Sequence, residues 1–158
     1  MDADKVKTFT EQTGTPVPDS PQLMSRESVD FLVKMMLDEI MELYCTVDDT
    51  TDYKYKMIEM IVNAKNLPKT NLSTPETIAE QADALVDCYY YSLNAAAKHG
   101  VNLSKIFNLV HDANMNKRDP ESGLFEKRED GKVIKPYGWM PPDVVGLIKS
   151  HMKDGSWA

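Results

Sequence analysis

The segment from Thr77 to Ala97 is the feature that most constrains the fold. Its only charged side chains are Glu80, Asp83 and Asp87, and at about 100° per residue in a helix they fall on one narrow stripe. The apolar face lies on the far side, and the flanks carry no charge. A helix that is apolar nearly all round is usually buried, and unpaired buried carboxylates are prohibitively costly. The pattern therefore predicts a long, packed helix whose acidic stripe needs cations.

A second acidic cluster lies earlier in the chain, at Asp38-Glu39-Ile40-Met41-Glu42, among many apolar residues. Residues three apart share one face of a helix, so Glu39 and Glu42 point the same way. Several carboxylates that converge without matching Lys or Arg residues suggest a hard divalent cation, with Mg²⁺ as the default. Either cluster alone is better explained as a solvated charged face. Together they predict a metal site made by four residues: Glu39, Glu42, Glu80 and Asp83.

The bulk properties exclude several classes of partner. The net charge of -7 and the isoelectric point near 4.9 argue against a surface for nucleic acid or anionic membranes. No apolar run approaches the roughly 18 residues of a membrane span, and the first twenty residues lack the apolar core of a signal peptide. Cys45 and Cys88 have no CxxC spacing, which indicates neither a zinc site nor a disulfide framework. We expect a cytoplasmic protein with no nucleic-acid and no membrane partner.

The order of helix signals predicts one all-α domain over residues 1–158, of the four-helix-bundle type. Residues 1–22 are expected to form an extended arm, because Gly14, Pro16, Pro18 and Pro21 oppose helix formation. Capping residues and Gly or Pro stops then delimit four helices: Ser25 to about Cys45, Asp52 to Lys65, Ser73 or Thr74 to Lys98, and Asn102 to about Asn116.

The texture of the chain changes beyond Asp119-Pro120. Asp130-Gly131 is a strong signal for a β-hairpin, which we place at 122–137, before a short C-terminal helix over 141–153. Its basic and aromatic side chains suit the binding of phosphates and the stacking of a base. Charged edges also protect hairpins against aggregation, and the ribbon alone favours that explanation. The side chains concerned are Lys127, Arg128, Lys132, Lys135, Tyr137 and Trp139.

The spacing Asp38-Glu39-x-x-Glu42 followed by Glu80-x-x-Asp83 resembles the ExxE…ExxD signature of the all-α nucleoside triphosphate pyrophosphatases. That superfamily includes MazG-like enzymes, dimeric dUTPases and phosphoribosyl-ATP pyrophosphatase. Asp38 stands where the signature usually has Glu. Further stretches are similar to the phosphoribosyl-ATP pyrophosphohydrolase-like, MazG-related branch, so that the likeness covers nearly the whole chain. They are Phe9…Gly14-x-Pro16-x-Pro18, His111-Asp112-Ala113-Asn114-Met115-Asn116-Lys117, Arg128-Glu129-Asp130-Gly131-Lys132-Val133 and Pro141-Pro142-Asp143.

The resemblance implies a hydrolase that cleaves a nucleoside triphosphate by metal-activated water to the monophosphate and pyrophosphate. It implies Mg²⁺, or Mn²⁺, on the four acidic residues above, with Asp38 and Glu39 as the catalytic residues and Asp38 positioning or deprotonating the water. Asp87 would orient a ligand or a water molecule. Relatives usually assemble as dimers, so a homodimer or higher homo-oligomer is expected. The substrate-binding candidates are Asn94, Asn114, Lys117, Arg128, Lys132 and Lys135.

Several alternatives stay open. The preferred nucleotide is not identified by the sequence; dUTP is the first candidate from the nearest relatives, and deoxycytidine, purine or damaged nucleotides remain. A phosphoribosyl-ATP pyrophosphatase-type hydrolase is a second candidate. A di-iron bundle needs Glu-x-x-His pairs, and none of the three histidines stands three residues after a Glu. A non-enzymatic helical interaction module would instead keep its acidic faces exposed and show no activity dependent on Mg²⁺.

Overall fold

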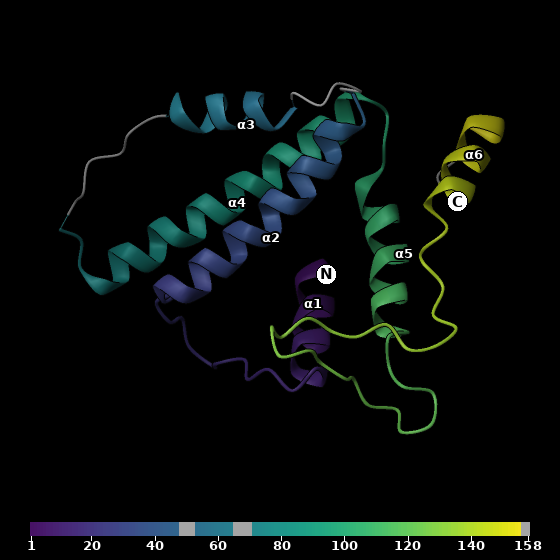
Figure 1. Ribbon diagram of the computed structural model, residues 1–158, viewed down its shortest axis with the longest axis horizontal. Coiled ribbons are helices and arrows are strands. Elements are labelled where there is room, and N and C mark those ends of the chain that lie inside the picture. Colours follow the sequence, from purple (N-terminus) through teal and green to yellow (C-terminus); the bar gives the residue numbers. More distant parts are fainter. Residues whose placement is uncertain (48–52, 65–70, 156–158) are drawn as a thin grey trace. The chain divides into compact units, whose positions relative to one another are not determined.

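The computed structural model describes residues 1–47, 53–64 and 71–155, and these residues form six helices and no extended strand. The prediction of an all-α fold is therefore confirmed. Figure 1 traces the elements in chain order: α1 (Asp2–Gln12), α2 (Arg26–Cys45), α3 (Tyr53–Val62), α4 (Thr74–Lys98), α5 (Leu103–Met115) and α6 (Val144–Asp154).

The chain divides into two compact units, each considered by itself below. One unit comprises 1–20 and 85–158, and we call it the terminal unit. The other comprises 21–84, and we call it the central unit. Helix α4 begins in the central unit and ends in the terminal unit. The prediction of a single domain over 1–158 stays a prediction.

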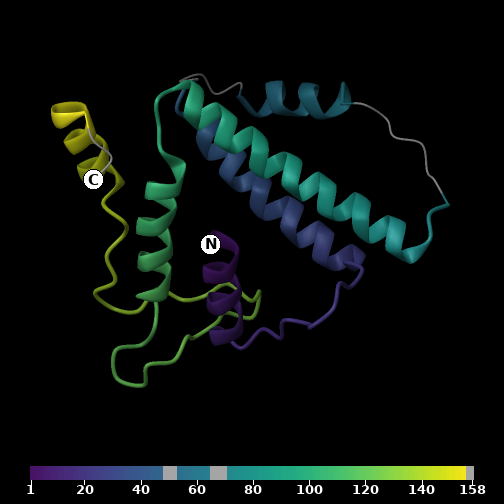
Figure 2. The same ribbon diagram turned by 180° about the vertical axis from the view of Figure 1, so that it is seen from behind.

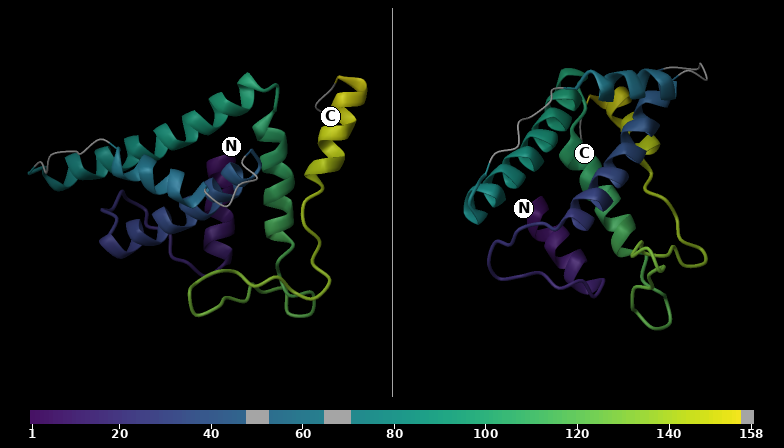
Figure 3. Two further views of the ribbon diagram at one scale, coloured as in Figure 1. Left: turned by 45° about the horizontal axis from the view of Figure 1, so that its top comes forward. Right: turned by 60° about the vertical axis from the view of Figure 1, so that its left-hand side comes forward.

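Helix α5 is the centre of the terminal unit. Helices α1 and α6 both pack against it, as Figures 2 and 3 show. The Lys5 ammonium on α1 donates a hydrogen bond of 2.6 Å to the side-chain oxygen of Asn108 on α5. The ring of Phe9 meets that of Phe125 edge-on at 5.3 Å between centroids. Ala113 is 7% exposed, so the best-buried point of this unit lies near the end of α5.

The predicted extended arm over 1–22 is wrong for its first half, because α1 occupies Asp2–Gln12. Acidic residues at Asp2 and Asp4 stabilise the first turn of a helix, and no Pro or Gly interrupts the chain before Gly14. The prolines act only from Pro16 onward, where the chain is irregular up to the start of α2. The prolines therefore do not affect the conformation of residues 2–12.

The helix boundaries follow the predicted caps closely. Ser25 accepts the backbone N–H of Ser28 at 3.2 Å at the start of α2, and Asn102 accepts that of Lys105 at 3.2 Å at the start of α5. Helix α4 begins after Ser73, and its end is followed by Gly100 at a φ of 71°. Asp143 caps α6, whose range matches the predicted 141–153 within three residues. The second predicted helix is α3, and its predicted limits, 52 and 65, lie outside the described residues.

The predicted hairpin over 122–137 is not supported. Two isolated antiparallel bridges, Arg118 to Phe125 and Lys127 to Val133, are formed instead of continuous strands. The turn itself is present, since Gly131 has a φ of 81° and its N–H bonds to the carbonyl of Arg128 at 2.9 Å. A two-stranded ribbon is marginal without a face to pack on, and most of its side chains are exposed. The turn predicted at Asp130-Gly131 is therefore present, whereas the strands predicted on either side of it are not supported.

The central unit has little interior of its own. Among its described residues only Met57 is buried, at 9% exposure. A pair of hydrogen bonds joins its two ends: the Met24 N–H donates to the Gln81 amide oxygen at 3.0 Å, and the Gln81 amide nitrogen donates to the Met24 carbonyl at 3.3 Å. The start of α2 is thus held beside the first part of α4. Both helices run in the same direction from there (Figures 1 and 3).

Candidate active site

The acidic candidates occupy exposed positions on two helices. Asp38, Glu39 and Glu42 lie on the second half of α2, and Glu80 and Asp83 lie near the start of α4, all in the central unit. Each pair shares a helix face as predicted. Asp87 is also exposed on α4, but it belongs to the terminal unit.

A single chain does not gather these carboxylates. Across the described ranges, no three His, Cys, Asp or Glu side chains come close enough to hold a metal ion. The chemistry of the predicted donors fits Mg²⁺, which prefers carboxylate oxygens and water. Their arrangement within one copy does not. The structure keeps Glu39 with Glu42, and Glu80 with Asp83, but it does not join the two pairs.

The basic candidates behave differently, because several of them meet in the terminal unit. The Lys117 ammonium donates to the Asn114 side-chain oxygen at 2.7 Å. It also lies 5.5 Å from the centre of the Trp139 ring, and the Lys135 ammonium lies 4.6 Å from the same ring. The indole N–H of Trp139 donates to the carbonyl of Ala113 at 2.7 Å, which fixes the ring against the end of α5. We call Asn114, Lys117, Lys135 and Trp139 the lysine–tryptophan cluster.

The position of Lys117 is electrostatically unfavourable for a cation. Burial lowers the pKa of its ammonium, and the positive charges of Lys135 and Lys132 lower this pKa further. Within the described part of the chain, no ion pair joins Lys117 or Lys135 to a carboxylate. Two cations held together without a neutralising acid form a site that an anion would stabilise. The cluster is therefore suited to bind phosphate groups.

A cavity of about 250 Å³ opens beside the cluster. Its walls are polar and include carboxylates as well as amines. Asp119 accepts the backbone N–H groups of Ser122 and Glu121, which lowers the pKa of its carboxyl group and keeps it ionised. The lining residues are Lys117, Asp119, Glu126, Ile134, Lys135, Pro136 and Tyr137. The sequence did not predict Asp119 and Glu126 as residues of the site. The one signal for them was their position after α5.

The other basic candidates lie at the turn. Arg128 pairs with Asp130, whose carboxylate also accepts the Lys132 N–H at 3.1 Å. This pairing raises the pKa of the Arg128 guanidinium and lowers that of the Asp130 carboxyl group. Much of the Arg128 charge is thus already compensated, whereas Lys132 still contributes positive potential at Lys117. Asn94 is exposed on α4, and the structure does not bring it into the lysine–tryptophan cluster.

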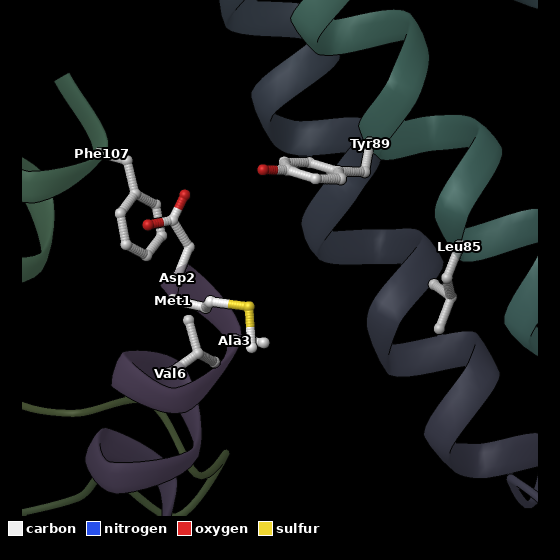
Figure 4. A pocket seen from close by; sticks show the side chains of 7 residues that line it. All are labelled: Met1, Asp2, Ala3, Val6, Leu85, Tyr89 and Phe107. Atoms are coloured by element: carbon white, nitrogen blue, oxygen red, sulfur yellow. The ribbon is translucent and has the colours of Figure 1, made fainter. Parts of the chain in front are cut away.

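An apolar cavity of about 950 Å³ lies elsewhere in the terminal unit. The sequence did not predict this cavity, because α1 lines one side of it and the residues of α1 were expected to be extended. Figure 4 shows the rings of Tyr89 and Phe107 and the carboxylate of Asp2 at its edges. The remaining lining residues are Met1, Ala3, Val6 and Leu85.

Comparisons with known proteins identify the family of this chain. The family model described as "Phosphoribosyl-ATP pyrophosphohydrolase" matches residues 6–114. The chain belongs to that family. The matched range contains both acidic pairs and Asn114, and it ends before Lys117, Lys135 and Trp139. This protein is accordingly a hydrolase that acts on phosphoric anhydride bonds.

A crystal structure of a proposed NTP pyrophosphohydrolase from Exiguobacterium sp. 255-15 has the same fold as this pyrophosphohydrolase. The TM-score is 0.79 with 23% sequence identity, and the match covers 98% of each chain. At that identity the likeness establishes the fold alone. No curated protein matches the sequence. No described helix of this pyrophosphohydrolase is both long and apolar enough to cross a membrane.

Proposed function

We propose that this pyrophosphohydrolase is an Mg²⁺-dependent nucleoside triphosphate pyrophosphohydrolase. Water would add to the α-phosphorus, the bond from that phosphorus to the bridging oxygen would break, and the products would be a nucleoside monophosphate and pyrophosphate. The observation that carries the proposal is the family match, because it spans both acidic pairs. The lysine–tryptophan cluster supports it independently, because it places two cations beside a cavity without an ion-paired carboxylate.

The acidic residues would hold the metal and handle the water. Glu39, Glu42, Glu80 and Asp83 supply the hard oxygen donors that Mg²⁺ prefers. When bound, Mg²⁺ would neutralise phosphate oxygens and lower the pKa of a water molecule. Asp38, adjacent to Glu39, would accept a proton from the attacking water, and Asp87 would orient it.

The basic residues would act on the phosphates. Lys117 and Lys135 would offset the charge that develops on the leaving pyrophosphate, which is where electrostatic stabilisation contributes most. Lys132 and Arg128 would add positive potential from the turn, and the face of Trp139 offers a surface for a base or sugar. Asn114 holds Lys117 in place. Asn94 remains a candidate for reading the base or sugar.

The assembly of this pyrophosphohydrolase is proposed to be a homodimer or a higher homo-oligomer. Large apolar side chains on the helices of the central unit are exposed, including Leu43 at 69%, Ile58 at 57% and Val62 at 76%. Ile58 and Val62 stand one turn apart on α3 and share a face of that helix. Exposed apolar side chains that gather on one face are typical of an interaction site, and in a homo-oligomer the same surface serves both partners.

The substrate class has two candidates. We favour a deoxynucleoside triphosphate, with dUTP first, and a phosphoribosyl-ATP-type substrate is the alternative that the family description favours. Both carry a triphosphate on the 5′ carbon of a pentose, which the acidic pairs and the lysine–tryptophan cluster would recognise. A non-enzymatic interaction module is inconsistent with family membership.

The test is a panel of canonical and modified nucleoside triphosphates and phosphoribosyl-ATP, incubated with the full chain in Mg²⁺, in Mn²⁺ or with chelator. Monophosphate and pyrophosphate formed only with metal would support the proposal and identify the base. Glu42→Gln and Glu80→Gln are the matched variants, and both should abolish turnover. Release of orthophosphate with diphosphate would show that a different bond is cleaved.

A further inference from the structure

We infer that Tyr137 is the residue on which the base of the substrate stacks, beside the lysine–tryptophan cluster that holds the phosphates. This role rests on the proposed function in one respect, namely that the substrate is a nucleotide. It goes beyond that function by assigning the base to a named side chain, and by making the strength of the contact independent of which base is bound.

A tight turn presents Tyr137 to solvent. The backbone N–H of Trp139 donates to the carbonyl of Pro136 at 3.1 Å, and Gly138, the third residue of the turn, has a φ of 78°. A positive φ at that position is typical of a type II turn and favours glycine. The indole bond from Trp139 to Ala113 anchors the turn to α5. Tyr137 is the second residue of this turn, and its side chain is 105% exposed. Its position is therefore set by the backbone rather than by side-chain packing.

Tyr137 lines two cavities of different character. The cavity of about 250 Å³ is also lined by the two cations of the cluster, Lys117 and Lys135. A second cavity, of about 320 Å³, has Tyr137 and Trp139 in its walls, and among its described lining residues Arg118 alone is charged. A nucleotide carries charged phosphates at one end and a flat base at the other. The two cavities therefore supply cations for the phosphates and largely uncharged surface for the base.

Trp139 offers a second aromatic surface, but its ring already contacts both lysines. The Lys135 ammonium lies 4.6 Å and the Lys117 ammonium 5.5 Å from the centre of the ring. A base that covered this face would displace the cations that the ring attracts. Among the described residues, neither a cation nor a second ring contacts Tyr137. The uncovered ring is therefore the one assigned to the base.

A stacking role has a characteristic pattern of effects. Removal of an aromatic platform typically weakens binding by roughly 5-fold to 150-fold per stacked base. Every base has a π face, so the loss is similar for purines and pyrimidines. An inorganic phosphate chain has no base and is not affected. Tyr137 thus contributes affinity for nucleotides without selecting among the bases.

Tyr137→Ala tests this role in the full chain, with Mg²⁺ and with purine and pyrimidine nucleoside triphosphates. KM should rise by roughly 5-fold to 150-fold for each nucleotide, while kcat changes by less than about 2-fold. The inhibition constant of inorganic pyrophosphate should stay at its wild-type value, because pyrophosphate has no base to stack. Tyr137→Phe keeps the ring and should restore the KM. Leu124→Ala is the matched control, since Leu124 is 68% exposed in the same unit, and it should not alter the KM.

An unchanged KM in Tyr137→Ala would overturn this role. So would an equal rise in KM and in the pyrophosphate inhibition constant, which would show that the turn only supports the lysines. A rise confined to one base would also overturn it, because stacking does not distinguish the bases in that way. If the wild-type chain binds nucleoside triphosphates in calorimetry but cleaves none, the proposed function fails. The same loss of nucleotide affinity in Tyr137→Ala would then still support stacking on Tyr137.

Discussion

The two units of this pyrophosphohydrolase differ in the contacts that hold their residues together. The terminal unit packs α1 and α6 on α5, buries Ala113 and fixes Trp139 by a hydrogen bond to the backbone. The central unit is joined at its two ends by the Met24–Gln81 hydrogen bonds, and many large apolar side chains of α2 and α3 are exposed. Among the described residues each unit buries one side chain, Ala113 in the terminal unit and Met57 in the central unit. The comparison teaches that the terminal unit brings its candidate cations together within one chain, whereas the described acidic side chains of the central unit form no group that could hold a metal ion.

The largest effect is expected at the acidic residues. Asp83→Asn should lower kcat by at least about 10²-fold, because it removes a donor that holds charge at the reacting phosphates. Asp87→Asn, one turn further on the same stripe, should cost roughly 10-fold to 10²-fold, as expected for a residue that orients a ligand. Steady-state kinetics with saturating Mg²⁺ measures both. Equal losses would show that Asp87 contributes to catalysis as directly as Asp83.

The dependence of the central unit on a partner is tested by Ile40→Asp. Ile40 is 46% exposed on α2. If a second copy covers this side chain in the proposed homo-oligomer, a charge there should dissociate it, because an unpaired buried charge is costly. Leu124→Asp is the matched control, since Leu124 is 68% exposed in the terminal unit. Analytical ultracentrifugation reports the assembly. Dissociation by Leu124→Asp, but not by Ile40→Asp, would reverse the roles that we give to the two units.

Lys117 tests the terminal unit through pH. Its pKa is lowered by burial and by Lys135 and Lys132, so the ammonium loses its proton below the ordinary value of 10.5. Substrate binding that needs this charge should weaken as pH rises through the lowered pKa. Because the unfolded chain retains the proton in that window, the free energy of unfolding should rise with pH there.

The matched variant is Lys117→Arg, whose guanidinium stays charged. Its kcat/KM should remain flat over the alkaline range in which the wild-type value falls. Lys117→Met should lower kcat/KM throughout, whereas Arg128→Ala should have a smaller effect, because Arg128 is already paired with Asp130. An alkaline decrease that persists in Lys117→Arg would assign it to another group.

The smallest effect is expected at the Ser25 cap. Ser25→Ala removes the acceptor for the Ser28 N–H and should lower the free energy of unfolding by about 1 kcal/mol. Thermal unfolding monitored by circular dichroism measures this loss. If the central unit is stabilised mainly by its partner, the loss should decrease at high protein concentration, since association stabilises the folded state by mass action.

The sequence was informative wherever local chemistry decides the structure. Ser25, Asn102 and Gly100 located helix ends because caps and left-handed glycines act within a few residues. The helical spacing of Glu39 with Glu42, and of Glu80 with Asp83, also needed nothing beyond one helix. The hairpin was wrong because a turn residue such as Gly131 does not supply a packing partner for strands.

Tertiary relationships were less accessible. The Lys117–Trp139 contact joins residues that are far apart in sequence, and the sequence did not predict it. The level along the helix axis at which α2 and α4 meet could not be predicted, because helical spacing fixes a face but not that level. The Met24–Gln81 hydrogen bonds set it, and neither residue type indicates such a contact.

The shared direction of α2 and the first part of α4 limits how far the chain could be shortened by deletion. The end of α2 and the start of α4 lie at opposite ends of the pair, at least about 30 Å apart, which is the length of 20 residues at 1.5 Å per residue. An extended residue spans at most about 3.6 Å, so about nine residues are the fewest that could join the two helices. A deletion that leaves fewer would pull α4 away from the level at which Gln81 bonds to Met24.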